Sequence, residues 1–294
     1  MSAGELLPEI EAVLREGLAS KGRVLWLTGA GISAESGVPT FRGEGGFWRV
    51  DSREYRPEEL ATWRCFSSMP DAVWGWYLYR RGICRAAEPN AAHRALASLE
   101  ATLGDRFCLV TQNVDGLHLR AGNTLERTYQ IHGNLDFMRP VDGPGGPVLI
   151  PAEVGTKWAK NSWIDSRTRS LLTMPDGRAT RPHILWFDES YDDNNYRVES
   201  AAALATKCSL LVVVGTTGNT NLPLHIGRVA AQRGVPILVI NPEENPFSQM
   251  VSTGGVFHLP GTAGQWVPAV AERLDELAGD GDSGDGDSGD ADSG

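Results

Sequence analysis

Apolar residues along the chain gather in short runs separated by stretches with a helical repeat. The segment from Glu5 to Ala19 carries apolar side chains at helical spacing, and Arg23–Thr28 is an apolar run typical of a buried strand. Strand-like runs rich in Val, Ile and Leu that alternate with helices are typical of a parallel sheet covered on both faces. The pattern therefore predicts an α/β fold with a Rossmann-like parallel sheet and helices on both faces. The other expected strands are Phe107–Thr111, His183–Phe187, Leu210–Gly215 and Pro236–Asn241, and the other expected helices are Asn90–Leu103, Ser200–Cys208 and Leu222–Arg233.

Two stretches interrupt this alternation. Phe47–Ala87 is rich in Trp, Tyr and Arg and is expected to be helical, whereas Arg139–Arg181 holds many Gly, Pro and polar residues with little periodicity. Long insertions of this kind usually lie outside the sheet. We therefore expect a Rossmann-like core of about residues 20–48, 88–138 and 181–275, and a smaller lobe made from two insertions at about residues 49–87 and 139–180.

Composition and charge narrow the class of protein. Of the 294 residues, 41% are hydrophobic and 22% are charged, which is typical of a folded protein. The net charge of −10 argues against general nucleic-acid binding, and no apolar run approaches the roughly 20 residues that span a bilayer. The N-terminal segment lacks the basic start and apolar core of a secretion signal, so we expect a cytoplasmic protein.

One folded domain is expected to cover residues 1–278, followed by a tail of Gly, Ser, Ala and Asp over residues 279–294. Gly and Ser favour a flexible chain and Asp residues repel one another, so we expect this acidic tail to be disordered. A solubilising extension is the favoured interpretation, and an interaction tail is the alternative.

The four cysteines are scattered, and no two of them form a Cys-x-x-Cys pair. Neither a zinc knuckle nor a redox dithiol is therefore visible in the sequence. Cys108 and Cys208 lie in or beside strand-like runs, where we expect small buried thiols.

The apolar run Arg23–Thr28 leads directly into Gly29-Ala-Gly31 and the expected start of a helix. Glycines let a backbone approach a pyrophosphate, and the free N–H groups at a helix N-terminus attract anions. The spacing departs from Gly-x-Gly-x-x-Gly because Ala34 stands at the third glycine position, where alanine is tolerated. By itself the segment is also compatible with an ordinary tight turn that binds nothing.

Three longer segments give this loop a family context. Gly29–Gly43 (GAGISAESGVPTFRG), Thr111–His118 (TQNVDGLH) and Ile131–Asn134 (IHGN) closely resemble segments of the sirtuins, a family of NAD-dependent protein deacylases. The matches follow the family order and extend over roughly residues 22–275. The resemblance implies a Rossmann-like fold, NAD as a consumed co-substrate and an acyl-lysine protein or peptide as the partner. Weaker matches are Pro89–His93, Arg181–Phe187, Val214–Gly218 and Ile240–Asn241.

The resemblance also assigns an NAD site. Ala30, Gly31 and Ser33 are expected along the phosphates, and Phe41 and Arg42 are expected on a loop over nicotinamide, where the ring excludes water. For Phe41 a place in the core is the alternative. The full set of residues implied for NAD binding is Gly29, Ala30, Gly31, Ser33, Glu35, Phe41, Arg42, Gln112, Asn113, Asp115, Gly215, Thr216, Thr217 and Asn241.

The expected catalytic residues are Asn113, Asp115 and His132. Gln112, Asn113 and Asp115 follow a strand end, at the sheet edge where ligands bind. Amides can orient a ribose and a water, and an ionised carboxylate favours nearby positive charge, although Asn-Val-Asp-Gly is also a good turn. A neutral imidazole accepts a proton at physiological pH. The resemblance implies that His132 takes a proton through the ribose hydroxyls, so that 2′-O-acyl-ADP-ribose and free lysine form.

The other histidines carry no catalytic assignment. We expect a structural or supporting role for His118, which lies in one of the matched segments. His93, His183, His225 and His258 are left unassigned.

The chain departs from most sirtuins where they carry two pairs of zinc-binding cysteines. No cysteine lies between Cys108 and Cys208, and Arg139–Arg181 contains neither Cys nor His. Structural zinc needs such ligands in a closed tetrahedral set, so we predict no structural zinc. Packing must then hold the small lobe, and the candidates are Val148, Leu149, Ile150, Trp158, Trp163, Leu171 and Leu172.

Two further features concern the substrate. Asp188 stands where relatives usually have Gly, at a strand edge that pairs with the substrate peptide, and its side chain is expected to narrow the groove or to select basic flanking residues. Tyr77 and Arg80 share one helix face. Their spacing resembles the pair that sirtuins of the desuccinylase type use for an acyl carboxylate, an anion that suits a guanidinium fork. A solvated Arg and a packed Tyr are the alternative.

The sequence therefore predicts an NAD-dependent protein lysine deacylase that acts on acetyl or succinyl groups. The first alternative keeps NAD cleavage but transfers ADP-ribose to water or to a protein side chain. The second is a non-catalytic NAD-sensing module, which has no need of the base at His132.

Overall fold

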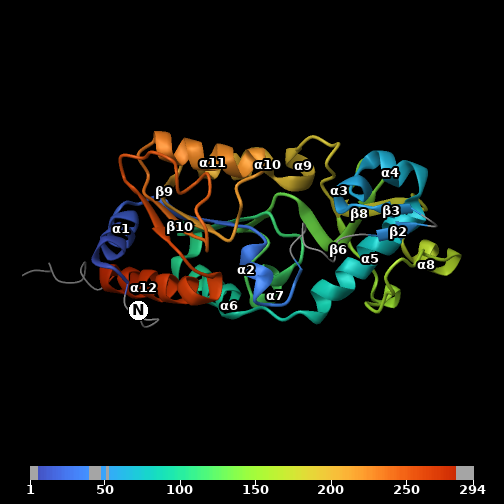
Figure 1. Cartoon of the computed structure of the whole chain (residues 1–294), viewed down its shortest axis with the longest axis horizontal. Coiled ribbons are helices and arrows are strands. Elements are labelled where there is room, and N and C mark those ends of the chain that lie inside the picture. The colour runs from blue at the N-terminus through green and yellow to red at the C-terminus, as the bar shows by residue number, and fades with distance from the viewer. Residues whose placement is uncertain (1–5, 40–47, 51–52, 283–294) are drawn as a thin grey trace, which may run out of the picture.

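A parallel sheet forms the centre of the larger lobe. The computed structural model describes residues 6–39, 48–50 and 53–282 (Figure 1). Within these residues, six strands pair in parallel in the order β11-β10-β9-β1-β4-β5, as the alternating pattern predicted. The strands are β1 (Arg23–Thr28), β4 (Phe107–Thr111), β5 (Thr128–Gln130), β9 (Cys208–Val214), β10 (Ile237–Ile240) and β11 (Val256–Leu259).

Helices cover both faces of this sheet, because alternate residues of each strand point to opposite sides. Val24 and Trp26 of β1 are buried against α1, α6 and α12, whereas Leu25 and Leu27 are buried against α10 and α11. The two helical layers lie on either side of the sheet in Figure 1. The bounds are α1 (Pro8–Ala19), α6 (Ala91–Leu103), α10 (Val198–Leu204), α11 (Asn221–Gln232) and α12 (Ala263–Asp282).

The end of α12 differs from the predicted domain boundary. The sequence predicted a disordered tail from residue 279, whereas α12 continues to Asp282. The buried apolar residues of α12 end at Leu274, and the partly buried Leu277 and Ala278 still pack against the same core.

The second lobe is built around a small antiparallel sheet of order β7-β6-β8, visible at the right of Figure 1. Here the prediction of a strand at His183–Phe187 in the parallel sheet was wrong. The strand β8 (Thr180–Ile184) starts earlier and pairs antiparallel with β6 (Gly133–Pro140), to which β7 (Val148–Leu149) also pairs. A short apolar run indicates a buried strand but does not identify the strand with which it pairs.

The segment expected to be helical from Phe47 to Ala87 contains both strands and helices. A hairpin of β2 (Trp48–Val50) and β3 (Arg53–Tyr55) precedes α3 (Pro57–Leu60), α4 (Trp63–Ser68) and the long α5 (Pro70–Ala86). The remaining short elements are α2 (Gly31–Ala34), α7 (Leu117–Ala121), α8 (Ser166–Leu171), α9 (Asp193–Tyr196) and the 3-10 helices η1 (Gly104–Arg106) and η2 (Ala152–Val154).

The small lobe has its own apolar core between α5 and the antiparallel sheet. Among the packing candidates, Ile150 and Leu172 are buried in this core, and Trp158 and Leu171 pack against it partly buried. The prediction was wrong for three others, because Val148, Leu149 and Trp163 are 36%, 63% and 48% exposed. The core is filled instead by aromatic side chains of α5, together with Trp186 after β8.

All four cysteines are buried free thiols, as predicted for Cys108 and Cys208. None of the helices in the described part of the chain is both long and apolar enough to cross a bilayer.

Candidate active site

Three loops meet at the carboxyl edge of the parallel sheet. They follow β1, β4 and β9, which are neighbours in the sheet. The first and third loops touch through their glycines: Gly31 N–H donates to the Gly215 carbonyl at 2.8 Å. A Cβ built on Gly31 would lie 2.6 Å from Gly215 Cα. These glycines are therefore required for contact between two loops, a role that is separate from any approach to phosphate.

A buried polar network joins the first loop to the second. The Ser33 hydroxyl on α2 donates to Asp115 Oδ2 at 2.7 Å and accepts from Asn113 Nδ2 at 3.0 Å. Asn113 Nδ2 also donates to the Gly29 carbonyl at 3.0 Å. Burial raises the pKa of the Asp115 carboxyl, and hydrogen bonds from the Leu117 N–H and the Ser33 hydroxyl oppose this shift. The structure thus brings together Ser33, Asn113 and Asp115, three of the residues predicted for the NAD site.

Gln112 links the second loop to the third. Its Nε2 donates to Thr216 Oγ1 at 3.0 Å, and its Oε1 accepts from the Thr220 hydroxyl at 2.8 Å. Asn245 Nδ2 donates to the Thr216 carbonyl at 2.9 Å. Thr220 and Asn245 were not predicted, because neither stands in a matched segment.

Some of the other predicted NAD residues follow the ends of β1, β9 and β10. Ala30 and Thr217 are exposed, and Asn241 directly follows β10, where its Nδ2 donates to the Glu243 carbonyl at 2.7 Å. The Glu35 carboxylate instead accepts from Gly264 N–H of α12 at 3.2 Å. Phe41 and Arg42 lie outside the described residues.

His132 stands between β5 and β6, beside the loop after β4. Its Nδ1 lies 3.0 Å from the Gln112 carbonyl oxygen, which can only accept, so Nδ1 carries the proton. Its Nε2 lies 2.9 Å from the Tyr191 hydroxyl. Burial lowers the pKa of His132 to about 4, and the hydrogen bond to Gln112 opposes this shift. The imidazole is therefore neutral at pH 7, with an unprotonated Nε2.

The residue after His132 has to be glycine. Gly133 has a φ of +90°, in the left-handed region, and a Cβ there would lie 2.0 Å from the His183 carbonyl oxygen of β8. The close contact of β6 and β8 thus fixes the backbone next to the imidazole. This gives a structural reason for the Ile-His-Gly-Asn segment.

Two other histidines form a buried pair near the network. His118 Nε2 contacts Thr28 Oγ1 at 3.1 Å, and His93 Nε2 contacts Ser33 Oγ at 3.4 Å. Their ring centroids are 4.8 Å apart. Burial lowers the pKa of His93 to about 4 and that of His118 well below its usual value. Both histidines thus lie beside the polar network in neutral form, and the supporting role of His118 stays a prediction.

A family model described as the Sir2 family matches residues 29–221, which contain the three loops and His132. The chain belongs to the Sir2 family.

Known proteins are similar to this chain over most of its length. An NAD-dependent protein deacylase of Leptospira interrogans is 36% identical over 250 residues, which are 84% of this chain and 91% of that protein. The mitochondrial NAD-dependent protein deacylase sirtuin-5 of Danio rerio is 35% identical over 90% of this chain and 87% of that protein. A crystal structure of a Sir2 homologue in complex with NAD is 29% identical with a TM-score of 0.73, covering 94% of this chain and 96% of that one.

Within this Sir2 chain, Tyr77 and Arg80 lie on α5. Tyr77 is buried, and its oxygen accepts a hydrogen bond from Trp186 Nε1 at 2.8 Å. The Arg80 guanidinium lies 5.3 Å from the centroid of the Trp76 ring. Burial lowers the pKa of Arg80, so its charge is held in a poorly solvated position.

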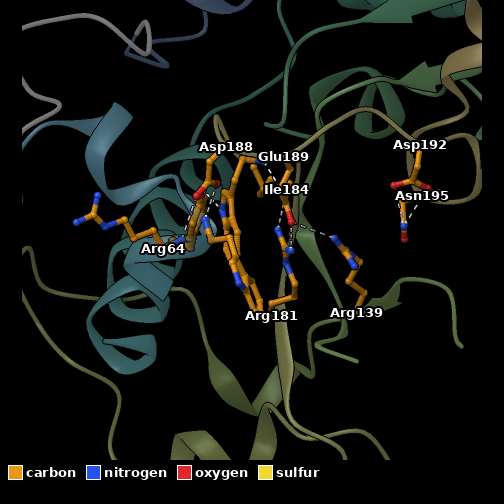
Figure 2. Close-up of polar contacts among 11 residues, drawn as sticks. Arg64, Arg139, Arg181, Ile184, Asp188, Glu189, Asp192 and Asn195 are labelled. Carbon is orange, nitrogen blue, oxygen red and sulfur yellow. Dashed lines mark hydrogen bonds and ion pairs between the residues drawn. The ribbon is translucent and has the colours of Figure 1, made fainter. Parts of the chain in front are cut away.

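Asp188 is exposed and hydrogen bonds to the start of α4. Its carboxylate accepts from the backbone N–H groups of Trp63 at 2.7 Å and Arg64 at 3.1 Å, at the start of α4 (Figure 2). The neighbouring Phe187 N–H donates to the Ala61 carbonyl at 2.9 Å. These contacts tie α4 to the segment after β8, and the effect of Asp188 on a substrate peptide stays a prediction.

Within the described residues, no group of three or more His, Cys, Asp or Glu side chains is arranged to hold a metal ion.

Proposed function

We propose that this Sir2 protein is an NAD-dependent protein lysine deacylase in which His132 is the general base. The observation that carries this proposal is the tautomer of His132: Nδ1–H donates to the Gln112 carbonyl, so that Nε2 is the unprotonated nitrogen that can accept a proton. The relatives from Leptospira interrogans and Danio rerio, both named NAD-dependent protein deacylases, support the reaction class.

The residues at the sheet edge fit NAD by their chemistry. Ala30 and Thr217 are exposed on adjacent loops, where small side chains leave the backbone open to a phosphate. Gln112 and Asn113 offer amide groups suited to ribose hydroxyls. The comparison structure with NAD bound has the same fold over most of this chain.

In this proposal NAD supplies a ribose whose bond to nicotinamide is cleaved as the acyl oxygen of lysine attacks. His132 Nε2 takes a proton from a ribose hydroxyl, and Nδ1–H on Gln112 keeps the ring oriented. Asp115, held by Ser33 and Leu117, places negative potential where positive charge develops. The ribose hydroxyl then bonds to the acyl carbon, a water adds to that carbon, and the carbon–nitrogen bond to lysine breaks. The products are nicotinamide, 2′-O-acyl-ADP-ribose and free lysine.

The acyl group is proposed to be acidic. Tyr77 oxygen already accepts from Trp186, so the phenol hydrogen is available to donate to an acyl carboxylate. Arg80 lies one helical turn further along α5, with a desolvated charge that a carboxylate would stabilise.

The experiment is an analysis of products by mass spectrometry. The protein is incubated with NAD alone, and with NAD plus an acetyl-lysine or a succinyl-lysine peptide. We expect acyl-ADP-ribose only when a peptide is present, and more of it from the succinyl peptide. ADP-ribose formed without peptide would indicate an NAD hydrolase instead, and binding of NAD without turnover would indicate a sensor.

We also propose that the small lobe is stable without zinc. Its apolar core between α5 and β6–β8, and the ion pair of the buried Arg181 with Glu189, supply contacts within the lobe. A chelator should therefore change neither the unfolding midpoint nor the activity. Stoichiometric zinc in protein purified without added metal would contradict this proposal.

A further inference from the structure

The proposed base already has a hydrogen-bond partner on the nitrogen that must take the proton. The Tyr191 hydroxyl lies 2.9 Å from His132 Nε2, and the two rings are stacked with centroids 6.0 Å apart and planes at 25°. Because Nδ1 carries the ring proton, Nε2 accepts and the Tyr191 hydroxyl donates. A neutral imidazole has one lone pair in the ring plane, and Tyr191 occupies it.

The segment around Tyr191 is fixed on both sides by carboxylates. Before it, Glu189 accepts from Arg181 Nη2 at 2.8 Å and from Trp186 N–H at 3.0 Å. Arg181 is itself buried, with its guanidinium 3.5 Å from the centroid of the Trp186 ring. Figure 2 shows Glu189 between Arg181 and Arg139. The turn that leads into Tyr191 is therefore anchored to β8.

After Tyr191, the chain is fixed by Asp192. Its carboxylate accepts from the Asn195 N–H at 2.7 Å and thereby caps α9, a pair that Figure 2 shows apart from the arginine cluster. Tyr191 thus lies between two anchored residues. The anchored backbone therefore holds the Tyr191 hydroxyl against His132.

A ribose hydroxyl that gives its proton to His132 Nε2 has to hydrogen bond to the same lone pair that accepts from Tyr191. The Tyr191 and ribose hydroxyls therefore compete for one acceptor, and one hydrogen bond has to be exchanged when the dinucleotide binds. Exchange of a neutral hydrogen bond costs little more than the net value of one such bond.

We propose that Tyr191 is a positioning residue that masks His132, holding the base in its Nδ1–H tautomer until the ribose of NAD displaces the phenol. This inference rests on the proposed function, because it assumes that His132 is the base. The mask is removed on NAD binding, before bonds break. Its effect should therefore appear in the KM for NAD and not in kcat.

The kinetic test compares Tyr191→Phe with the wild type at saturating acyl-lysine peptide. The variant keeps the ring and removes only the hydroxyl. We expect the KM for NAD to fall by about fivefold, the effect of one net hydrogen bond, with kcat within about twofold. Tyr196→Phe is the matched control: it removes a hydroxyl from the tyrosine that stacks on His183, and it should leave both constants unchanged.

Two results would overturn the proposal. A fall in kcat of tenfold or more in Tyr191→Phe would mean that the phenol takes part in proton transfer. A KM equal to that of Tyr196→Phe would mean that the contact does not compete with NAD.

A second readout needs no turnover. Nitrogen NMR of the imidazoles, with His132 assigned by its loss in His132→Asn, reports whether Nε2 accepts a hydrogen bond. We expect its resonance to differ between ligand-free wild type and Tyr191→Phe, and this difference to vanish with ADP-ribose bound. No difference in the ligand-free proteins contradicts the mask, whereas failure of the proposed function would instead appear as absent acyl-dependent NAD cleavage.

Discussion

Replacing Arg80 by Met tests the acyl group that the enzyme prefers. Met keeps a long apolar stem against Trp76 and removes the guanidinium charge. The variant should bind an acetyl group as the wild type does, because that group carries no charge. A succinyl carboxylate would lose its cationic partner.

The size of the effect follows from the environment of Arg80. Burial lowers its pKa, so the guanidinium is poorly solvated before substrate arrives and a carboxylate competes with little water. A hydrogen bond to a charged group contributes about 1.5–3 kcal/mol. That range corresponds to a loss of roughly 10- to 150-fold in kcat/KM for the succinyl peptide, with less than about threefold for the acetyl peptide.

Arg85→Met is the matched control for this assay. Arg85 lies on the same helix, is 40% exposed and pairs with Asp136 at 3.0 Å. Removing its charge should leave the ratio of the two kcat/KM values unchanged. Equal losses on both peptides in Arg80→Met, or the same ratio in both variants, would refute the role of Arg80 in acyl selection.

Three further predictions concern stability and can be checked by urea unfolding. Burial lowers the pKa of His93 and His183 to about 4, so between about pH 6.5 and 4 these histidines are protonated in the unfolded state but not in the folded state, and stability should fall as the pH drops through this range. The expected loss at pH 5 is about 2 kcal/mol per histidine. A free energy of unfolding that does not change with pH would contradict this prediction. Gly133→Ala should cost about 3 kcal/mol, from the left-handed backbone and the contact with the His183 carbonyl, and an unchanged midpoint would contradict that contact. Asp188→Ala should cost about 1 kcal/mol through loss of its hydrogen bonds to the first N–H groups of α4, with Asn restoring much of the stability. No loss would mean that these hydrogen bonds are not formed in solution.

The sequence predicted the parallel sheet because its strands have a consistent pattern. The runs that became β1, β4, β9 and β10 are rich in Val, Ile and Leu and are buried on both faces. Two edge strands, β5 (Thr128–Gln130) and β11 (Val256–Leu259), were missed because each is short and, at an edge, pairs with one neighbour only. The run at His183–Phe187 was assigned to the wrong sheet, because its partner β6 is set by tertiary contacts that leave no local signal.

The predicted site residues were chosen from their order in matched segments, and the structure adds the contacts among them. Ser33, Asn113 and Asp115 form one network. Asp188 accepts hydrogen bonds from two backbone N–H groups of α4. These contacts could not be predicted from its position, because the donors lie 125 and 124 positions away in the chain. The same holds for Tyr191, which is 59 residues from His132. Contacts over such separations cannot be inferred from spacing.

The most direct test of the account is the turnover of His132→Ala against His225→Ala, with NAD and an acyl-lysine peptide. His225 is exposed on α11 and serves as the matched histidine. General base catalysis contributes roughly 100- to 10,000-fold, so formation of acyl-ADP-ribose should fall by at least 100-fold in His132→Ala and stay unchanged in His225→Ala. Turnover by a folded His132→Ala protein within a few-fold of wild type would contradict the assignment of the base.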